Sequence, residues 1–110
     1  MARSMTGKNG SAPATATTGR ILACIRSIPI GCVMSYGDVA KCAGSRSPRQ
    51  VGNLLAAVNH SVPWHRVVHA DGTLAPRPHD LQRQRLITEG VRFLGSRVDI
   101  NAHRRTPGVR

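Results

Sequence analysis

The chain has 110 residues, which allows one small domain, and it contains neither a run of about 18 apolar residues that could span a membrane nor an early apolar stretch typical of a secretory signal. We therefore expect no membrane association and a cytoplasmic location, on the nucleoid in a bacterium or in the nucleus of a eukaryote. Sixteen basic residues, fourteen of them arginine, against five acidic residues give a net charge of +11, which favours a polyanionic partner such as nucleic acid, although arginine richness can also serve solubility.

Residues 1–18 are rich in Ser, Thr, Ala and Gly without periodicity, a composition that predicts a disordered N-terminal tail. A first amphipathic helix follows, with Thr18 placed to cap its start and Pro29 ending it. The apolar residues that recur at helical spacing in this helix are Ile21, Leu22, Ile25 and Ile28.

A short second helix is predicted by the spacing of Ser35 and Asp38, which are placed to form a capping box. Tyr36 then lies in the first turn of this helix, and Gly44 closes it.

A third helix begins with a similar device, in which Ser47 is the N-cap, Pro48 takes the first helical position and Gln50 reaches back to the cap. Its buried stripe consists of Val51, Leu54, Leu55 and Val58. Two helices joined by a short turn form the helix-turn-helix pattern, in which the second helix presents its N-terminal end to DNA. Arg49 lies at that end, where a cation opposes the helix dipole, so either contact with a partner or simple solvation explains it.

The rest of the chain predicts little regular structure beyond one more helix. Residues 62–68 read as an extended segment, and the turn signal at Asp71 and Gly72 predicts a small hairpin or wing. A last helix runs from about Asp80 to Glu89 and ends at Gly90, before an extended return. We expect the folded domain to span residues 19–100, and residues 101–110 to form a basic C-terminal tail.

Cysteines and histidines give no sign of a metal or a cofactor. The three cysteines include no C-x-x-C pair, so we expect small buried thiols and neither a disulfide framework nor a zinc ribbon. Three histidines lie close in the sequence, but Pro63 and the β-branched residues around them indicate an extended segment and disfavour a metal site. These residues are Cys24, Cys32, Cys42, His60, His65 and His69.

Four motifs, in order, carry a resemblance to a known family. They are Gly31 to Ala40 (GCVMSYGDVA), Arg49 to Gly52 (RQVG), Pro63 to Val67 (PWHRV) and Glu89 to Val91 (EGV). Over about residues 19–95 the chain resembles the DNA-binding and active-site domain of the O6-alkylguanine-DNA alkyltransferases, which carry P-C-H-R-V around a reactive cysteine. Trp64 in place of that cysteine resembles the alkyltransferase-like proteins, which bind alkylated guanine without repairing it. The resemblance implies a mainly α fold with a small β hairpin, a winged helix-turn-helix-like DNA-binding domain of the alkyltransferase type.

The resemblance also assigns residues to DNA binding and nucleotide flipping. Arg49 matches the finger arginine that enters the base stack in place of the extruded guanine, with Gln50 beside it. Tyr36 matches the tyrosine that presses a phosphate next to the flipped nucleotide. Small Gly52 and Ala56 would let the same helix approach the minor groove closely.

A second set of residues is expected to form the pocket for the alkylated base. Trp64 would provide an apolar wall against which an alkyl group rests without reacting, although an isolated tryptophan more often anchors a core. Pro63, His65 and Val67 flank it in the motif, and Arg77 matches an arginine at the lip of the pocket.

Three further residues match structural positions of the family. His65 and Glu89 match the pair that relays the proton of the reactive cysteine. Because this chain has no thiol at that position, we expect His65 and Glu89, like Arg66, to orient the loop. Asn59 lies next to the position of the family's hinge asparagine, which here is Val58, and the stretch from Arg49 to Trp64 is shorter than in other members.

The sequence thus predicts a non-catalytic sensor, a monomer that flips O6-alkylguanine out of duplex DNA, holds it and flags it for nucleotide excision repair proteins. One alternative is an active alkyltransferase that uses Cys24, Cys32 or Cys42 as the acceptor. Another is a sequence-specific helix-turn-helix regulator, which would normally dimerise.

Overall fold

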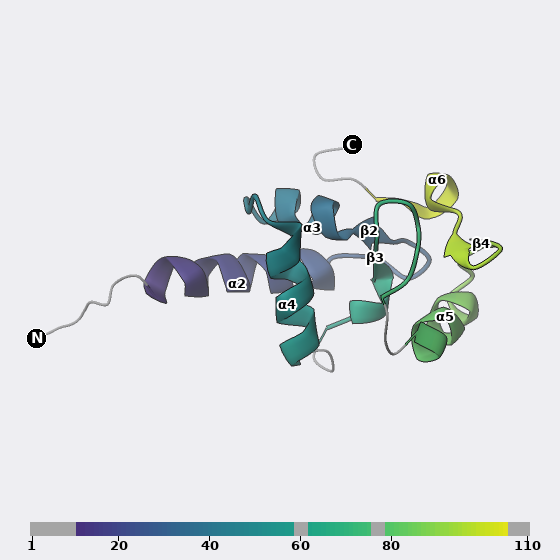
Figure 1. The fold of residues 1–110 in the computed structure, drawn as a ribbon, viewed down its shortest axis with the longest axis horizontal. Coiled ribbons are helices and arrows are strands. Elements are labelled where there is room, and N and C mark those ends of the chain that lie inside the picture. The colour runs from purple at the N-terminus through teal and green to yellow at the C-terminus, as the bar shows by residue number, and fades with distance from the viewer. Residues whose placement is uncertain (1–10, 59–61, 76–78, 106–110) are drawn as a thin grey trace, which may run out of the picture.

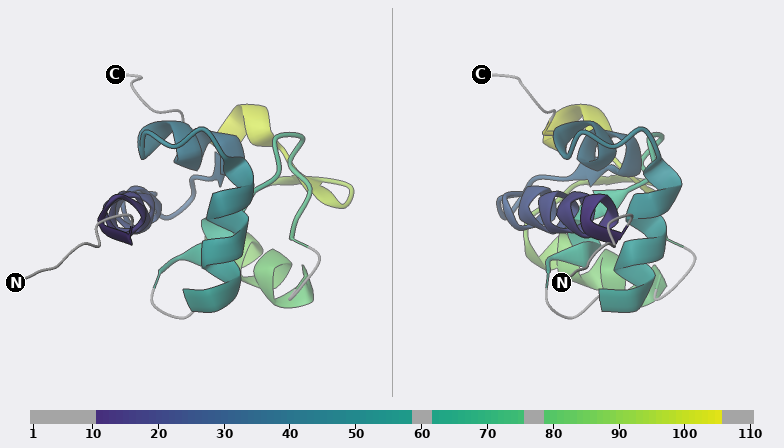
Figure 2. Two further views of the ribbon diagram at one scale, coloured as in Figure 1. Left: turned by 60° about the vertical axis from the view of Figure 1, so that its left-hand side comes forward. Right: turned by 90° about the vertical axis from the view of Figure 1, so that its left-hand side faces the viewer.

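A computed structural model describes residues 11–58, 62–75 and 79–105 of the chain and shows a mainly helical fold, as predicted (Figure 1). The expectations for Asn59, His60 and Arg77 lie outside the described residues. The elements are α2 (Ser11–Arg26), β2 (Met34–Ser35), α3 (Tyr36–Cys42), α4 (Pro48–Val58), the 3-10 helix η1 (Trp64–Arg66), β3 (Val67–Val68), α5 (His79–Thr88), β4 (Phe93–Leu94), β5 (Arg97–Val98) and α6 (Ile100–His103). Figure 2 shows α3 and α6 at one end of the molecule and α5 at the other, with α4 running between these ends. None of the described helices is long and apolar enough to cross a membrane.

Helix α2 begins at Ser11, well before the expected cap at Thr18, so residues 11–18 belong to a helix and the expected disordered tail is wrong for them. Alanine-rich sequence favours a helix, and Pro13 lies in the first turn, where its missing N–H costs no hydrogen bond. The N-terminal half of α2 projects beyond the rest of the fold (Figure 1), while Ile21 and Ile25 in the other half are fully buried.

Helices α2 and α3 are joined covalently, because Cys24 and Cys42 form a disulfide with their Cα atoms 6.2 Å apart. The expectation of free thiols is therefore wrong for this pair, and Cys32 is the free cysteine of the described residues. Packing of the two helices brings the sulfur atoms together, and Arg20 Nε adds a 2.8 Å hydrogen bond to the carbonyl of Ala43.

The capping box of α3 is confirmed. The backbone N–H of Asp38 donates to Ser35 Oγ at 2.9 Å, and the N–H of Ser35 donates to Asp38 Oδ2 at 3.1 Å. The helix ends before Gly44, whose φ of +75° suits glycine.

The turn between α3 and α4 is built differently from the prediction. Ser47 Oγ caps α4 as expected, accepting from the N–H of Gln50 at 3.2 Å. Gln50 does not reach back to the cap; its Oε1 accepts from Ser45 Oγ at 2.9 Å, and that hydroxyl also accepts from the N–H of Ser47 at 3.1 Å. Ser45 thus ties the turn to the first turn of α4.

Strands β2 and β3 pair in parallel, with Met34 opposite Val67 and Ser35 opposite Val68. The turn predicted at Asp71 and Gly72 is confirmed by the hydrogen bonds between His69 and Thr73 and between Gly72 and His69, but residues 73–75, which follow it, form no strand. The antiparallel pair lies later, between β4 and β5. Strand β3 is buried on both faces and lies inside the fold next to β2.

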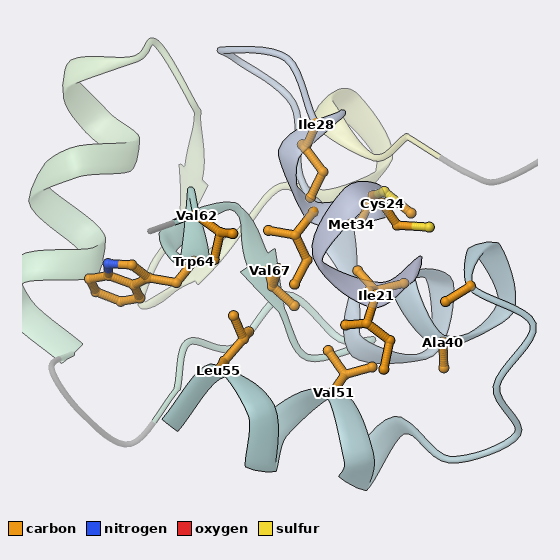
Figure 3. Packing of buried hydrophobic residues seen from close by; sticks show 13 residues of the cluster. Ile21, Cys24, Ile28, Met34, Ala40, Val51, Leu55, Val62, Trp64 and Val67 are labelled. Carbon is orange, nitrogen blue, oxygen red and sulfur yellow. The ribbon is translucent and has the colours of Figure 1, made fainter. Parts of the chain in front are cut away.

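The β2–β3 pair separates two hydrophobic clusters, because successive side chains of a strand point to opposite faces. Met34 and Val67 belong to the larger cluster under α2, α3 and α4 (Figure 3), whereas Val33 and Val68 belong to a smaller one with α5 and β5. The larger cluster includes Ile21, Ile28, Val51, Leu55, Val62 and Trp64.

The end of the described chain returns to the start of the helix-turn-helix. The backbone of residues 103–105 pairs with Val33, through hydrogen bonds of 2.9 Å and 2.8 Å. Arg104 Nε and Nη2 donate to the buried carboxylate of Asp38 at 2.9 and 2.7 Å. Residues 101–105 are thus part of the fold, and the expected C-terminal tail is wrong for them. Burial would raise the pKa of Asp38, but the hydrogen bonds from Arg104 and Ser35 outweigh it and lower the pKa.

We expect Asp38→Ala to lower the free energy of unfolding by about 2 kcal/mol, because it removes a capping box and leaves Arg104 without its partner. Urea unfolding at pH 7 measures the change. Asp99→Ala is the matched control, since Asp99 is also an N-cap residue but its side chain makes no capping hydrogen bond. Equal losses in the two variants would contradict the importance of the Asp38 contacts.

Candidate nucleic-acid interface

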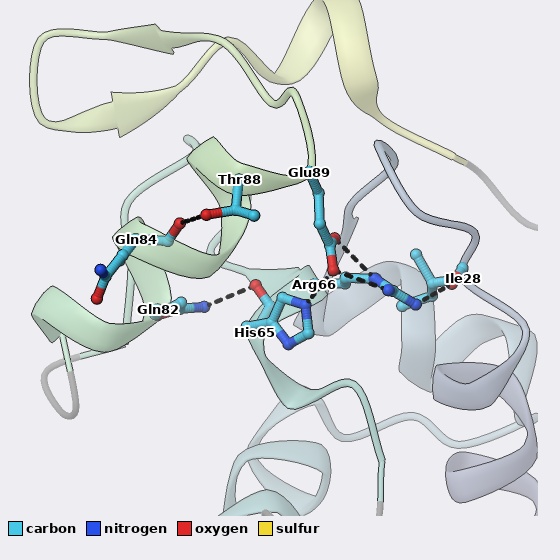
Figure 4. Close-up of polar contacts among 7 residues, drawn as sticks. All are labelled: Ile28, His65, Arg66, Gln82, Gln84, Thr88 and Glu89. Atoms are coloured by element: carbon cyan, nitrogen blue, oxygen red, sulfur yellow. Dashed lines mark hydrogen bonds and ion pairs between the residues drawn. The ribbon is translucent and has the colours of Figure 1, made fainter.

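The carboxylate of Glu89 holds the loop that contains Trp64 (Figure 4). His65 Nε2 lies 2.8 Å from Glu89 Oε2, and Arg66 donates to both carboxylate oxygens at 3.0 and 2.8 Å. The remaining guanidinium nitrogen, Nη1 of Arg66, donates to the carbonyl of Ile28 at 2.9 Å. These contacts therefore hold the loop both to the end of α5 and to the segment that follows α2.

Burial and hydrogen bonding in this network shift the pKa values of Glu89 and His65. The hydrogen bonds from Arg66, followed by the contact with His65, lower the pKa of Glu89 to about 2 against the opposing effect of burial. Burial lowers the pKa of His65, so the ring is neutral near pH 7 and its Nε2–H donates to Glu89. Its buried Nδ1 has no hydrogen-bond partner among the described residues.

Gln82 of α5 supports the same loop and was missed by the sequence analysis. Its side chain is completely buried, with Nε2 donating to the carbonyls of His65 and Val67 at 3.2 and 2.9 Å. Its Oε1 accepts from the N–H of Ala75 at 2.9 Å. The sequence did contain a sign of this role. Gln82 lies four residues before the apolar Leu86, and this spacing places both side chains on the same, buried face of the helix.

Trp64 lies at the edge of the larger cluster, on the side of α5 (Figure 3), and only 7% of its surface is exposed. Its indole meets the ring of His65 edge-on, with centroids 6.0 Å apart, and the guanidinium carbon of Arg85 lies 5.8 Å from its centroid. Pro63 is half-buried and Val67 is fully buried. The structure thus places Trp64 as a core residue, and the pocket assigned to these side chains stays a prediction.

The exposed face of α4 carries the residues assigned to flipping. Arg49 and Ala56 are exposed and Gly52 is half-buried, and their spacing places the three on one face, away from the buried Val51. A Cβ atom at Gly52 would lie 3.9 Å from Cε1 of Tyr36, so this face runs directly beside the tyrosine at the start of α3. Burial raises the pKa of Tyr36, which keeps its hydroxyl protonated and able to donate a hydrogen bond.

The charges around this face favour an anion. The carboxylate of Asp38 in α3 is paired with Arg104, and that of Glu89, which holds the loop, is paired with Arg66. Arg46 and Arg49 are exposed in and after the turn between α3 and α4. Among the described residues, no group of three or more His, Cys, Asp or Glu side chains could hold a metal ion. A phosphate backbone is the natural partner for such a surface.

The sequence of this chain is similar to those of known DNA-binding proteins. A family model for the DNA-binding domain of 6-O-methylguanine DNA methyltransferase matches residues 16–91. The DNA base-flipping protein of Escherichia coli (strain K12) is 46% identical over 91 residues, covering 77% of this chain and 70% of that protein. Alkyltransferase-like protein 1 of Schizosaccharomyces pombe is 39% identical over 71 residues, covering 58% of this chain and 66% of that protein.

Solved structures give the same picture. S. pombe Atl1 in complex with damaged DNA containing O6-carboxymethylguanine matches with a TM-score of 0.75 and 28% identity, over 84% of this chain and 97% of that chain. The O6-methylguanine methyltransferase of Mycobacterium tuberculosis matches with a TM-score of 0.56 and 29% identity, over 66% of this chain and 47% of that chain.

Acid should weaken the fold through Glu89. Its pKa falls from 4.5 to about 2 on folding, so its contribution to the free energy of unfolding is complete above pH 4.5 and is lost as the pH falls towards 2. We expect Glu89→Gln to be less stable than the wild type at pH 7 and the difference to shrink through this range, as measured by urea unfolding midpoints. Asp80→Asn, at an exposed acid in the first turn of α5, is the control. A deficit of Glu89→Gln that is the same at pH 7 and at the acid end would disprove this role.

Proposed function

We propose that this chain, which belongs to the family of the 6-O-methylguanine DNA methyltransferase DNA-binding domain, is an alkyltransferase-like protein that binds O6-alkylguanine in duplex DNA and holds it without chemistry. The family resemblance drawn from the four motifs is confirmed by the matches to the family model and to its relatives. The observation that carries the proposal is Trp64 within the loop that Glu89 and Gln82 hold, beside a helix-turn-helix. An indole cannot accept an alkyl group as a thiolate does.

Binding begins with the backbone, because a protein with this net charge is attracted to DNA whatever its sequence. The damaged nucleotide must then leave the stack, at a cost on the order of 2–4 kcal/mol. Arg49, at the exposed start of α4, offsets part of that cost by stacking in the vacated place and bonding to the orphaned base. Tyr36 offsets more by donating its hydroxyl to a phosphate beside the flipped nucleotide.

The flipped base would meet the loop of residues 63–67, with the edge of Trp64 as an apolar surface for the alkyl group. Because Trp64 is buried in the unbound protein, a neighbouring side chain must move aside before the base can contact part of the indole. Arg85 is one of the described side chains next to it, with its guanidinium carbon 5.8 Å from the centroid of the indole. His65, Arg66 and Glu89 keep the loop in place in this scheme, and no proton needs to move through them.

A lesion that is held and not repaired requires another activity to remove it. We propose that the bound complex is the signal for nucleotide excision repair proteins, which would remove the damaged stretch as an oligonucleotide. No described surface identifies the docking partner, so this step rests on the family resemblance alone.

The first measurement compares two short duplexes that differ by a single O6-methylguanine, using fluorescence anisotropy at physiological salt. We expect at least ten-fold tighter binding of the damaged duplex, about 1.4 kcal/mol. Arg49→Ala should lose most of this preference, because it removes the residue that fills the stack, whereas Arg97→Ala, an exposed arginine on β5, should retain it. Equal binding of both duplexes by the wild type would leave a general DNA-binding protein and refute the sensor.

A second measurement tests for chemistry. After incubation with DNA that carries a labelled O6-methyl group, we expect no label on the protein, since Cys24 and Cys42 are joined to each other and Cys32 is half-buried near β2. Trp64→Cys should also fail to become an efficient alkyltransferase. Stoichiometric labelling of the wild type, or rapid labelling of Trp64→Cys, would show that the chain is built for transfer.

A further inference from the structure

His69 and Tyr36 lie side by side because of the sheet, although they are far apart in the sequence. The parallel ladder pairs Met34 with Val67 and Ser35 with Val68, so the next residue of each strand, Tyr36 and His69, follows at the same end. Their ring centroids are 4.9 Å apart with an angle of 43° between the planes. In parallel strands such carboxyl ends are where ligands commonly bind, because side chains from both strands converge there.

Helix α4 approaches the same tyrosine from another element. A Cβ atom at Gly52 would lie 3.9 Å from the ring of Tyr36, and Arg49 is one turn earlier on that face of α4. Tyr36 thus lies where the helix-turn-helix and the end of β3 meet. A side chain on the β3 side that shares the ring of Tyr36 is well placed to share its partner.

The surroundings of His69 leave its imidazole available to an anion. The residue is exposed, and no described side chain forms a hydrogen bond with its ring nitrogens. Its backbone is fixed by a tight turn, in which its N–H donates to the carbonyl of Thr73 and its carbonyl accepts from the N–H of Gly72, both at 2.9 Å. Asp71, the acid in this turn, accepts the hydroxyl and the N–H of Thr73 at 2.7 and 3.0 Å.

We propose that His69 binds the same backbone phosphate as Tyr36, so that the phenol and the imidazole form a two-donor clamp on one phosphate of the DNA. This inference rests on the proposed function, in which Tyr36 contacts a phosphate next to the flipped nucleotide. The imidazole contributes an N–H donor and also packs against the tyrosine ring, which limits the ring's freedom before DNA arrives. A fixed pair of donors binds a phosphate more tightly than one mobile hydroxyl, because less side-chain entropy is lost on binding.

Anisotropy titrations with the damaged and undamaged duplexes test the clamp, using the full chain and three substitutions at one position. We expect His69→Ala to bind both duplexes about ten-fold more weakly, because a backbone contact does not depend on the lesion. His69→Phe keeps an aromatic ring beside Tyr36 but has no donor, and it should be as weak as His69→Ala. His69→Gln keeps an N–H donor and should recover most of the affinity.

Controls separate the clamp from other effects. His79→Ala, at an exposed histidine that begins α5, should bind like the wild type. Replacing single phosphates around the lesion by neutral methylphosphonates should reveal one position at which His69→Ala loses clearly less affinity than the wild type, because only the contact with Tyr36 remains to be lost there. Urea unfolding of each variant shows whether it is folded under the binding conditions.

Each outcome decides between the two proposals. Wild-type affinity in His69→Ala, or full recovery in His69→Phe, would overturn the phosphate contact and leave the lesion sensor intact. Equal binding of the two duplexes by the wild type would refute the lesion sensor, while a ten-fold loss in both His69→Ala and His69→Phe, with recovery in His69→Gln, would still establish His69 as a phosphate contact.

Discussion

The carboxylate of Glu89 is the point on which the arrangement of the site depends. It accepts hydrogen bonds from His65 and from Nε and Nη2 of Arg66, and Nη1 of Arg66 links it to the carbonyl of Ile28. A cation and a carboxylate that are largely removed from water stabilise a fold only if their hydrogen bonds are nearly complete, and here the half-buried Arg66 and Glu89 share four contacts with their surroundings. The contacts that fix the loop of residues 63–67 relative to α2 and α5 thus come from side chains other than that of Trp64. In the alkyltransferases this position serves a cysteine, whereas in this chain the same brace presents a tryptophan.

The short parallel pair of β2 and β3 performs a different task, because it connects the loop to the helix-turn-helix. Each strand has only two residues, yet β2 leads directly into the capping box of α3 and β3 follows directly from η1. Both strands are fully buried between two hydrophobic clusters, which makes a shift of register costly, since it would exchange the residues of the clusters. Tyr36 and the loop are consequently held on one rigid frame, with Arg49 carried by the neighbouring α4. A protein that must rotate a nucleotide between these groups needs such fixed distances.

Devices that act within a few residues could be predicted from the sequence. The capping box of Ser35 and Asp38, the cap at Ser47 and the stop at Gly90 all depend on local spacing, and the structure confirms them. Contacts between distant residues could not be predicted, because spacing carries no information about which elements pack together. The Cys24–Cys42 disulfide and the hydrogen bonds of Gln82 belong to this class. His69 is an example: its position four residues after His65 assigned it no role, because the extended segment disfavours a metal site, whereas the parallel ladder places it beside Tyr36.

The disulfide between α2 and α3 gives the protein two levels of stability that depend on its surroundings. The bridge closes a loop with a sequence separation of 18 residues, and restricting an unfolded chain by a loop of that size is worth about 3 kcal/mol. For a small domain this is a large part of the total free energy of unfolding. In a reducing compartment α2 would lose this covalent link and keep its non-covalent contacts, which include its buried isoleucines and the hydrogen bond from Arg20 to the carbonyl of Ala43. The free energy of unfolding of the oxidised protein would therefore be larger than that of the same chain with both cysteines reduced by cellular thiols.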